Sequence, residues 1–257
     1  MVQLVGTQWL AERLGAAGLV TLDPRRPMKY LSGHLPGAIN LPIYRAFGPD
    51  GALLDAAALG QWLGIGGVGN GAKPVLYDSP QGQNAAMLAW VLEYLGVAEV
   101  YVLEVFFERW KAEGRAIAYR PVESPSRRFD PKPNPSVRAT LEQVRDNATE
   151  RLVDFRSREE FTGERDLDGR PGHIPHAVNL QWLALNGPGD RLLQPREELE
   201  RTLAGAGVGR GQAVIAYCRS GPRAALGYLG LIEAGFKARL YDGSFAQWAR
   251  AGMPVEK

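Results

Sequence analysis

The sequence predicts an α/β protein built from two similar domains, each a parallel β-sheet flanked by helices on both faces. Short apolar segments alternate with segments of helical periodicity along the whole chain, and this alternation favours parallel strands connected by helices. Landmarks of the first half recur at one offset in the second: His34 returns as His173 and Asn40 as Asn179, each 139 positions later. Because this period is far too long for a solenoid repeat, it indicates two copies of one domain.

The elements of the first half follow from the spacing of apolar residues. Strands are expected at 19–23, 74–78 and 100–103, and a turn marked by glycine and proline at 33–41 leads into a short strand. Thr7 can cap a first helix. Helices are expected at 8–16, 53–63, 84–95 and 106–112.

A proline-rich segment at 120–136 separates the two halves. Its prolines exclude a regular helix or strand interior and favour an extended linker laid over the surface. The predicted domains are therefore 1–119 and 137–257.

In the second half the alternation begins again. A glycine- and proline-marked turn at 172–180 repeats the turn of the first half. Strands are expected at 152–156, 214–217 and 239–242, and helices at 140–147, from 222 onward and at 245–249.

Cys218 is the only cysteine of the chain and lies where a strand is predicted to end and a helix to begin. Unpaired backbone N–H groups and the positive end of a helix dipole face such a position, and they favour a reactive thiolate. A lone cysteine can instead be an inert core residue. The two arginines that follow it, Arg219 and Arg223, together with Gly221 between them, favour the reactive thiol.

The two halves differ at two places that bear on the site. Under the common offset Ser79 falls at the position of Cys218, so the first domain is expected to be a catalytically inactive scaffold. The second half also carries a longer charged segment at 161–170. This segment is either a solvated loop or a lip that brings Arg165 or Arg170 to an anionic substrate.

Composition narrows the functional class. A formal net charge of +2 gives no case for nucleic-acid binding, and a single cysteine cannot form an internal disulfide. One cysteine and three histidines make a metal site improbable. The N-terminal residues 1–14 are typical of an amphipathic helix rather than a signal peptide, and no apolar run approaches membrane-spanning length. A cytoplasmic protein without a membrane association is expected.

The chain resembles the tandem-domain rhodanese sulfurtransferases, which include thiosulfate and 3-mercaptopyruvate sulfurtransferases. The resemblance covers essentially the whole chain and is carried by 154–161, 172–175, the Cys218 loop, and 241–244 with Trp248. It implies two rhodanese-like domains, an inactive first and an active second, and a cysteine persulfide intermediate. It also implies that no cofactor is required, and that Asp154, Arg156 and Asp242 brace the site.

The chemistry that this resemblance implies is a two-step transfer. A Cys218 thiolate takes the outer sulfur of a small anionic donor as a persulfide, and cyanide, a thiol or a protein thiol then removes it. The loop amides from Arg219 onward and the helix dipole can stabilise the charge.

Two sulfur donors are compatible with the loop sequence, Cys218-Arg219-Ser220-Gly221-Pro222-Arg223. Arg219 resembles the thiosulfate enzymes and favours a sulfonate-like dianion. Ser220 resembles the mercaptopyruvate enzymes, where it would relay a proton to the departing enolate, with His34 as a possible helper. Pro222 removes one amide donor from the loop. The sequence favours thiosulfate.

Two other functions remain open. Phosphatases that share the rhodanese fold have a longer loop between cysteine and arginine than Cys218 to Arg223 allows, so this function is disfavoured. A persulfide carrier or sensor that hands its sulfur to a protein partner would use the same loop, and turnover with a small acceptor separates it from an enzyme.

Overall fold

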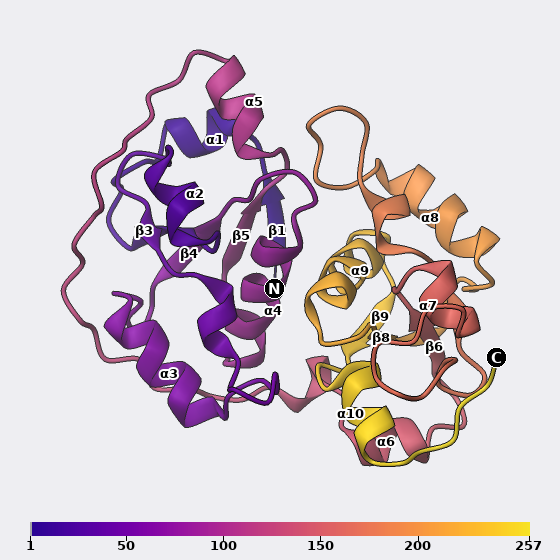
Figure 1. Ribbon diagram of the computed structural model, residues 1–257. Helices are drawn as coiled ribbons and strands as arrows, with labels where there is room; N and C mark the ends of the chain where they lie inside the picture. Colours follow the sequence, from indigo (N-terminus) through magenta and orange to yellow (C-terminus); the bar gives the residue numbers. More distant parts are fainter. Residues whose placement is uncertain (1) are drawn as a thin grey trace. The chain divides into compact units, whose positions relative to one another are not determined.

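The computed structural model describes residues 2–257, which form two compact units, each an α/β structure (Figure 1). The first unit is the chain up to Asn134 together with Pro188–Leu192. The second unit is Pro135–Gly187 together with Leu193–Lys257. The chain passes from one unit to the other inside the proline-rich segment 120–136.

The first unit holds a parallel sheet of strand order β1-β5-β4-β2-β3. Its strands are β1 (Val2–Val5), β2 (Leu19–Asp23), β3 (Ile39–Asn40), β4 (Lys73–Leu76) and β5 (Val100–Leu103). Its helices are α1 (Thr7–Ala11), α2 (Pro27–Leu31), the 3-10 helix η1 (Ile43–Ala46), α3 (Ala56–Ile65), α4 (Gln83–Tyr94) and α5 (Phe107–Ala112).

Helices cover both faces of this sheet, as predicted. On one face Leu10 of α1 and Trp110 of α5 pack with Val75 and Tyr77 in one apolar cluster. Helix α4 contacts β1, β4 and β5, and nine of its residues are buried. Apolar residues of successive strand positions therefore face two helical layers, which is why the strands read as continuous apolar runs.

The predicted N-terminal helix is wrong in its first part. Val2–Val5 pairs in parallel with β5 and forms the edge strand β1, and the helix α1 is confined to Thr7–Ala11. Thr7 does not cap this helix, because the N-cap residue is Gly6. Glycine has no side chain, so no side-chain hydrogen bond caps the helix. Pairing with β5 buries Val2 and Val5, and this long-range contact outweighs the local helical spacing.

The second unit holds a parallel sheet of strand order β7-β6-β8-β9. Its strands are β6 (Arg151–Asp154), β7 (Val178–Asn179), β8 (Ala213–Tyr217) and β9 (Lys237–Leu240). Its helices are the 3-10 helix η2 (Pro135–Val137), α6 (Leu141–Arg145), α7 (Arg158–Thr162), the 3-10 helix η3 (Trp182–Leu185), α8 (Arg196–Gly205), α9 (Pro222–Glu233) and α10 (Ser244–Arg250).

The second sheet is also covered on both faces. Val144 of α6 and Trp248 of α10 pack with Leu152 and Ile215 on one face. Helix α9 contacts β8 and β9, and α8 packs on α9. A Cβ atom at Gly227 of α9 would lie 2.4 Å from the ring of Phe155, so this glycine lets the helix approach the end of β6 closely.

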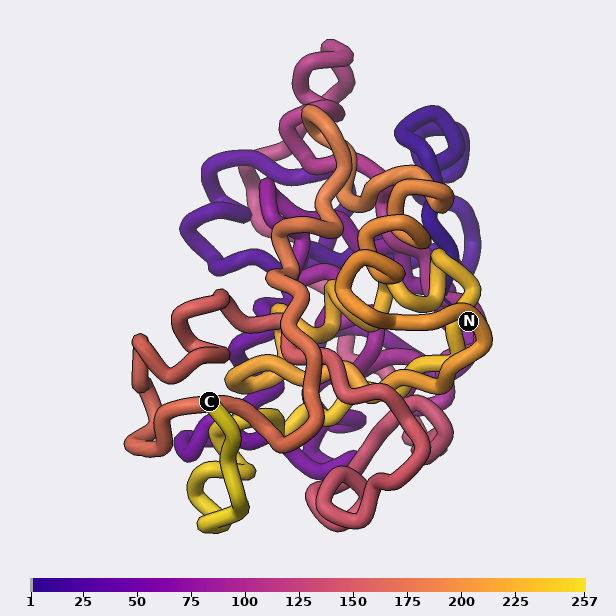
Figure 2. The backbone as a smooth tube through the Cα atoms, turned by 90° about the vertical axis from the view of Figure 1, so that its right-hand side faces the viewer, coloured from indigo at the N-terminus to yellow at the C-terminus, as the bar shows by residue number. Residues whose placement is uncertain are grey.

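The C-terminal segment completes the second unit. Its Glu256 exchanges two backbone hydrogen bonds with His173, of 2.8 and 3.0 Å. Figure 2 shows the yellow C-terminal segment beside the part of the chain that contains His173. In residues 2–257 there is no helix that is both long enough and apolar enough to cross a membrane.

The proline-rich segment is extended and lies on the first unit. The N–H of Arg127 donates to the Gly64 carbonyl and the N–H of Lys132 to the Leu95 carbonyl, both at 2.9 Å.

Several short helices were not predicted from the sequence, because a helix of five residues is too short to show a helical period of apolar residues. These are α2, α7 and the 3-10 helices; the longer α8 was also left unassigned.

The same buried polar cluster occurs once in each unit. In the first, Arg25 donates to the Asp23 carboxylate and to the Gly33 carbonyl, while Tyr77 donates to Asp23. In the second, Arg156 donates to Asp154 and to the Gly172 carbonyl, and Tyr217 bonds Asp154. The repeat therefore preserves an ion pair that fixes the turn after the first long strand of each unit.

This equivalence corrects the position assigned to Ser79. Tyr77 and Tyr217 have the same role, so Asp78 is the counterpart of Cys218. The carbonyl of Asp78 accepts from the N–H of Phe107, just as the carbonyl of Cys218 accepts from that of Phe245. The loop of the first unit is one residue longer before its helix-capping glycine, and the extra residue shifted the sequence alignment.

The Asp78 carboxylate fills the loop at the start of α4. It accepts from the N–H groups of Ser79, Asn84 and Ala85 at 2.8 to 3.0 Å, and from the Asn84 side chain at 3.2 Å. Burial raises the pKa of Asp78 to about 6, although these donors oppose the shift. The first unit thus holds its own negatively charged group where the second holds a sulfur atom.

We expect Asp78→Ala to lower the free energy of unfolding by about 1–3 kcal/mol, because three backbone N–H groups lose their acceptor. Ser79→Ala is the matched control on the same loop. Chemical denaturation followed by circular dichroism measures both. Equal effects of the two substitutions would show that the Asp78 carboxylate does not hold this loop together.

Candidate active site

Cys218 lies at the carboxyl end of β8, in the loop that leads into α9. Strand β8 is an inner strand, paired with β6 on one side and β9 on the other. In open parallel sheets this end of an inner strand is where ligands bind. The buried run Val214–Tyr217 holds the end of the strand rigidly in the core.

The loop turns sharply because of its glycine and proline. Gly221 has φ = 106°, a conformation that L-residues with a side chain rarely adopt, and it is the N-cap residue of α9. Pro222 occupies the first turn of the helix, where a missing N–H costs least. The sequence prediction of a strand, a tight loop and a helix is confirmed.

The Cys218 sulfur is held by the loop backbone. Cys218 is 1% exposed, and the N–H of Gly221 donates to its Sγ at 3.2 Å. The helix α9 begins directly after this donor, so its unpaired N–H groups and dipole favour negative charge on the sulfur.

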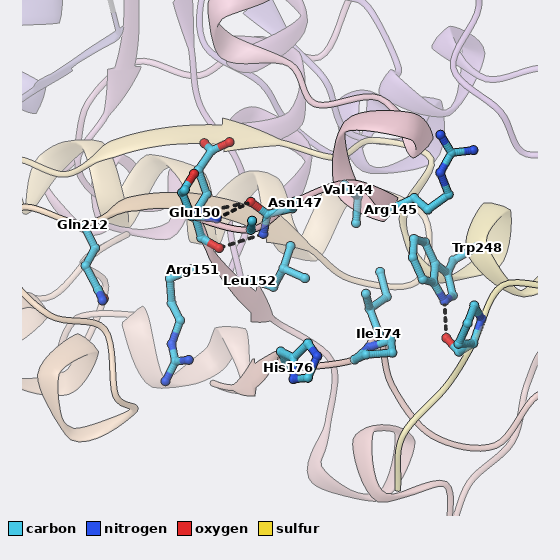
Figure 3. A pocket seen from close by; sticks show the side chains of 14 residues that line it. Val144, Arg145, Asn147, Glu150, Arg151, Leu152, Ile174, His176, Gln212 and Trp248 are labelled. Atoms are coloured by element: carbon cyan, nitrogen blue, oxygen red, sulfur yellow. Dashed lines mark hydrogen bonds between the residues drawn. The ribbon is translucent and has the colours of Figure 1, made fainter.

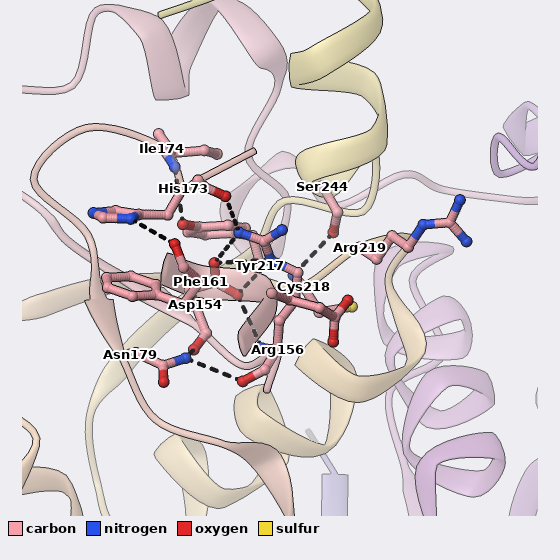
Figure 4. Close-up of polar contacts among 12 residues, drawn as sticks. Asp154, Arg156, Phe161, His173, Ile174, Asn179, Tyr217, Cys218, Arg219 and Ser244 are labelled. Carbon is pink, nitrogen blue, oxygen red and sulfur yellow. Dashed lines mark hydrogen bonds and ion pairs between the residues drawn. The ribbon is translucent and has the colours of Figure 1, made fainter. Parts of the chain in front are cut away.

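Ser244 is a residue of the site that sequence reasoning missed. Its hydroxyl accepts from the Cys218 N–H at 3.2 Å and donates to the Tyr241 carbonyl at 2.8 Å. It is fully buried and has φ = 53°, a strained conformation for a serine. Figure 4 shows Ser244 next to Cys218. A fully buried serine in a strained turn is a signal that only the structure reveals.

The start of α10 also fixes the loop. The carbonyl of Cys218 accepts from the N–H of Phe245, and that of Arg219 accepts from the N–H of Ala246, both at 3.0 Å. Arg156 lies over the Phe245 ring at 3.9 Å while it binds Asp154. The predicted Asp154–Arg156 pair is therefore present and packs beneath α10, where it braces the loop indirectly.

Arg223 is held by Glu160, a partner that the sequence did not suggest. Its guanidinium donates to both carboxylate oxygens, at 2.6 and 2.9 Å, and Glu160 in turn belongs to a capping box with Ser157. Burial opposes ionisation of Glu160, but Arg223 outweighs it and lowers the pKa of Glu160 to about 2. Burial likewise opposes the charge of Arg223, but Glu160 and the nearby Cys218 sulfur raise the pKa of Arg223 above its ordinary value.

Arg219 is held by Asp168, another partner that the sequence did not suggest. Its guanidinium donates to the carboxylate through Nε at 3.1 Å and Nη2 at 3.0 Å, and to the Leu167 carbonyl at 3.3 Å. Figure 4 shows the Arg219 side chain extending away from the buried pair Asp154 and Arg156.

The remaining predicted residues have partners other than the Cys218 sulfur. Arg170 donates to the Met253 carbonyl at 2.8 Å, so its charge is bound at the C-terminal segment. Arg165 is exposed, and its backbone N–H donates to the Glu159 carbonyl. Asp242 binds Arg138 at 2.7 and 2.8 Å. The segment 161–170 therefore meets the loop through Asp168 and the Leu167 carbonyl.

Each of the two repeated histidines, His34 and His173, makes its contacts within its own unit. His34 is fully buried, bonds the Tyr30 carbonyl through Nδ1 at 3.0 Å and stacks on the Tyr30 ring. His173 makes the same pair of contacts with Phe161. Both histidines therefore fix their own turns.

A cavity of about 600 Å³ lies elsewhere in the second unit (Figure 3). Its lining includes Arg151 and Leu152 at the start of β6, and none of its residues belongs to the Cys218 loop. The cavity is thus at the edge of the sheet opposite to the carboxyl ends of the strands.

In residues 2–257 there is no group of three or more histidine, cysteine, aspartate or glutamate side chains arranged to hold a metal ion.

The fold and the site define a protein with two rhodanese-like α/β units, one of which carries a buried thiol at a helix N-terminus. A model of the rhodanese-like domain matches residues 6–113 and again 137–251. The chain belongs to the rhodanese-like family.

Relatives of similar length are named as sulfurtransferases. A putative thiosulfate sulfurtransferase of Synechococcus elongatus is 34% identical over 272 residues, which cover 99% of this chain and 85% of that protein. A thiosulfate sulfurtransferase of Corynebacterium glutamicum is 30% identical, over 99% of this chain and 90% of its own. A 3-mercaptopyruvate sulfurtransferase of Escherichia coli is 28% identical, over 98% and 97%.

Solved structures show the same architecture. The 3-mercaptopyruvate sulfurtransferase SseA of Escherichia coli matches with a TM-score of 0.85 and 26% identity, over 95% of this chain and 99% of its own. EanB, at 21% identity and a TM-score of 0.89, shares the fold. The chain is therefore a sulfurtransferase of the rhodanese family, and both donor classes occur among the names of its relatives.

We expect Gly221→Ala to impair the loop, because a side chain at φ = 106° is strained by about 1–3 kcal/mol and the strain displaces the N–H that donates to Sγ. Sulfur-transfer kcat should fall by about ten-fold or more in a protein that is still folded at the assay temperature, although the strain lowers its melting temperature by several degrees. Gly205→Ala in α8 is the control, since nothing obstructs a Cβ atom there. Unchanged kcat in Gly221→Ala would contradict the role of this N–H.

We expect Glu160→Gln to lower the free energy of unfolding by about 2–3 kcal/mol at neutral pH. The pKa of Glu160 is lowered from 4.5 to about 2 in the folded protein, so the stabilisation is present above pH 4.5 and is lost as the pH falls towards 2. Denaturation curves between pH 7 and 2 measure this. The difference between the two proteins should shrink over that interval; a constant difference would contradict the assignment.

Proposed function

We propose that this protein transfers a sulfane sulfur from thiosulfate to cyanide or a thiol through a persulfide on Cys218. The observation that carries the proposal is the Gly221 N–H on the Cys218 sulfur at the N-terminus of α9. A thiolate and a persulfide both carry negative charge, and this arrangement stabilises that charge without a metal ion.

In the first step the Cys218 thiolate attacks the outer sulfur of thiosulfate. A bond forms between the two sulfur atoms, the bond from the outer sulfur to the sulfonate sulfur breaks, and sulfite leaves with the electron pair. The product is a Cys218 persulfide anion. No proton is needed, which suits a site whose described hydrogen bonds to sulfur come from backbone N–H.

In the second step an acceptor removes the outer sulfur. The carbon of cyanide attacks this sulfur, the sulfur–sulfur bond breaks, and thiocyanate leaves as the Cys218 thiolate is restored. A thiol or a protein thiol would react at the same atom. Donor and acceptor use one site in turn, so the kinetics should be ping-pong.

The loop supplies the supporting roles in this proposal. Gly221 donates to the sulfur, Ser244 fixes the Cys218 backbone, and Pro222 starts the helix although it offers no N–H of its own. Arg223 adds positive charge next to the sulfur, and Glu160 holds it in position. The first domain is proposed to be inactive, because Asp78 fills the equivalent loop.

The second candidate donor is 3-mercaptopyruvate. It is supported by the name of the 28% identical relative and of SseA, and by Ser220 in the loop. With this donor the carbon–sulfur bond breaks and the pyruvate enolate leaves, so a proton must be supplied. Ser220 is the residue proposed to relay it. Since His34 is buried in its own turn, it is not proposed as a helper.

The proposal predicts that incubation with thiosulfate adds one sulfur atom to the intact protein, measured by mass spectrometry, and that cyanide removes it. The same incubation with 3-mercaptopyruvate compares the donors. Cys218→Ala is the control and should gain no sulfur, since Cys218 is the only cysteine.

Each outcome has a defined meaning. Greater loading from thiosulfate supports the donor proposed, whereas greater loading from 3-mercaptopyruvate replaces it with the second candidate. Loading without thiocyanate formation would identify a persulfide carrier. A protein that gains no sulfur from either donor would contradict the proposal.

A further inference from the structure

We propose that Asp168 is an internal competitor of the anionic sulfur donor for Arg219 and thereby determines donor specificity. The inference rests on the proposed function, because it concerns the binding of the donor at the same loop. Its physical basis is that the Asp168 carboxylate already occupies the guanidinium of Arg219 in the free protein.

The contact is a forked ion pair. Nε and Nη2 of Arg219 both donate to the Asp168 carboxylate, at 3.1 and 3.0 Å, which is the geometry that arginine also uses for sulfonate and carboxylate ligands. Because Arg219 directly follows Cys218 in the chain, we take its guanidinium to be the group that attracts the negative charge of the donor. Asp168 is 12% exposed and Arg219 is 43% exposed, so the pair lies at the surface, where it can exchange partners.

The loop that carries Asp168 is shaped for this contact. The Asp166 carboxylate accepts from the N–H groups of Asp168 and Arg170, at 3.0 and 3.2 Å, and forms a tight turn. Arg170 then anchors the loop to the Met253 carbonyl. His34 follows Asp23 by eleven positions in the first unit, whereas His173 follows Asp154 by nineteen in the second. The longer segment of the second unit therefore carries the Asp168 carboxylate, and the shorter segment of the first unit has no residue that corresponds to it.

The positive charges near the loop differ in how accessible they are to a donor. Three arginines near the loop are paired: Arg156 with Asp154, Arg223 with Glu160 and Arg219 with Asp168. Of these pairs, the first two are largely buried and fixed, whereas the third is partly exposed. A donor that carries its negative charge to Arg219 must displace Asp168 or share the guanidinium with it.

The effect depends on the charge of the donor. Thiosulfate is a dianion, and the carboxylate of 3-mercaptopyruvate carries one charge. Repulsion by Asp168 acts on both, but about twice as strongly on the dianion. Asp168 therefore shifts preference away from thiosulfate and towards the singly charged donor, and its removal should do the reverse.

The first test does not require any sulfur transfer. Cys218 is the only cysteine, so its alkylation by iodoacetate, an anion, and by neutral iodoacetamide can be followed by mass spectrometry. In Asp168→Asn the ratio of the iodoacetate rate to the iodoacetamide rate should rise about five-fold at low salt, and less at high salt. Glu164→Gln removes an equal charge from the same loop, where Glu164 contacts Thr162, and should leave the ratio unchanged.

The second test measures specificity. In Asp168→Asn the KM for thiosulfate should fall about five-fold and that for 3-mercaptopyruvate about two-fold, with kcat nearly unchanged. In an Arg219→Gln background competition for the guanidinium is gone and only the charge repulsion by Asp168 remains, so adding Asp168→Asn should change KM and the alkylation ratio less than it does in the unmodified protein. Thermal melting confirms that each variant is folded.

The outcomes separate this inference from the proposed function. An unchanged alkylation ratio in Asp168→Asn, or a KM for thiosulfate that stays constant or rises, would overturn the competitor role. A raised alkylation ratio in a protein that forms no persulfide would uphold the competition of Asp168 with anions and overturn the sulfurtransferase proposal instead. A change of the same size in Glu164→Gln would show a general charge effect and overturn the specific one.

Discussion

The contact on which the site depends is the hydrogen bond from the Gly221 N–H to the Cys218 sulfur. It exists only because β8 ends at Tyr217, the glycine takes a left-handed conformation, and α9 begins at Pro222. A backbone donor at a helix N-terminus keeps its position without help from solvent, so it can stabilise a charged sulfur at every stage of a transfer. The packing of the second unit, including Gly227 against Phe155, serves to hold this junction in place.

The same junction occurs twice in the chain and holds a different group each time. In the first unit the Asp78 carboxylate accepts the N–H groups at the start of α4, and in the second the Cys218 sulfur accepts one at the start of α9. Both loops are built to hold an anion. The repeat therefore retains an anion-binding loop at the start of a helix, which the first unit fills with its own carboxylate and the second unit with the sulfur of Cys218.

The charged residues around the thiol form pairs, and this changes how the site is understood. Arg219 and Arg223 suggest two free positive charges when the sequence is considered alone, but each is paired with a carboxylate, Asp168 or Glu160. The buried pair of Arg223 with Glu160 fixes the geometry of the loop. The pair of Arg219 with Asp168 is partly exposed, and this is why we propose that the donor competes with Asp168 for the guanidinium.

The sequence by itself determined the two parallel α/β domains and the strand, loop and helix around Cys218, because these follow from periodicity, glycine and proline, which are local properties. Only the tertiary structure decided the partners. Asp168 and Ser244 meet the loop from segments more than twenty residues away, and no spacing rule predicts such a contact. The same holds for the edge strand Val2–Val5, whose pairing with β5 overrides its helical pattern, and for Asp78, which only the matched hydrogen bonds align with the thiol.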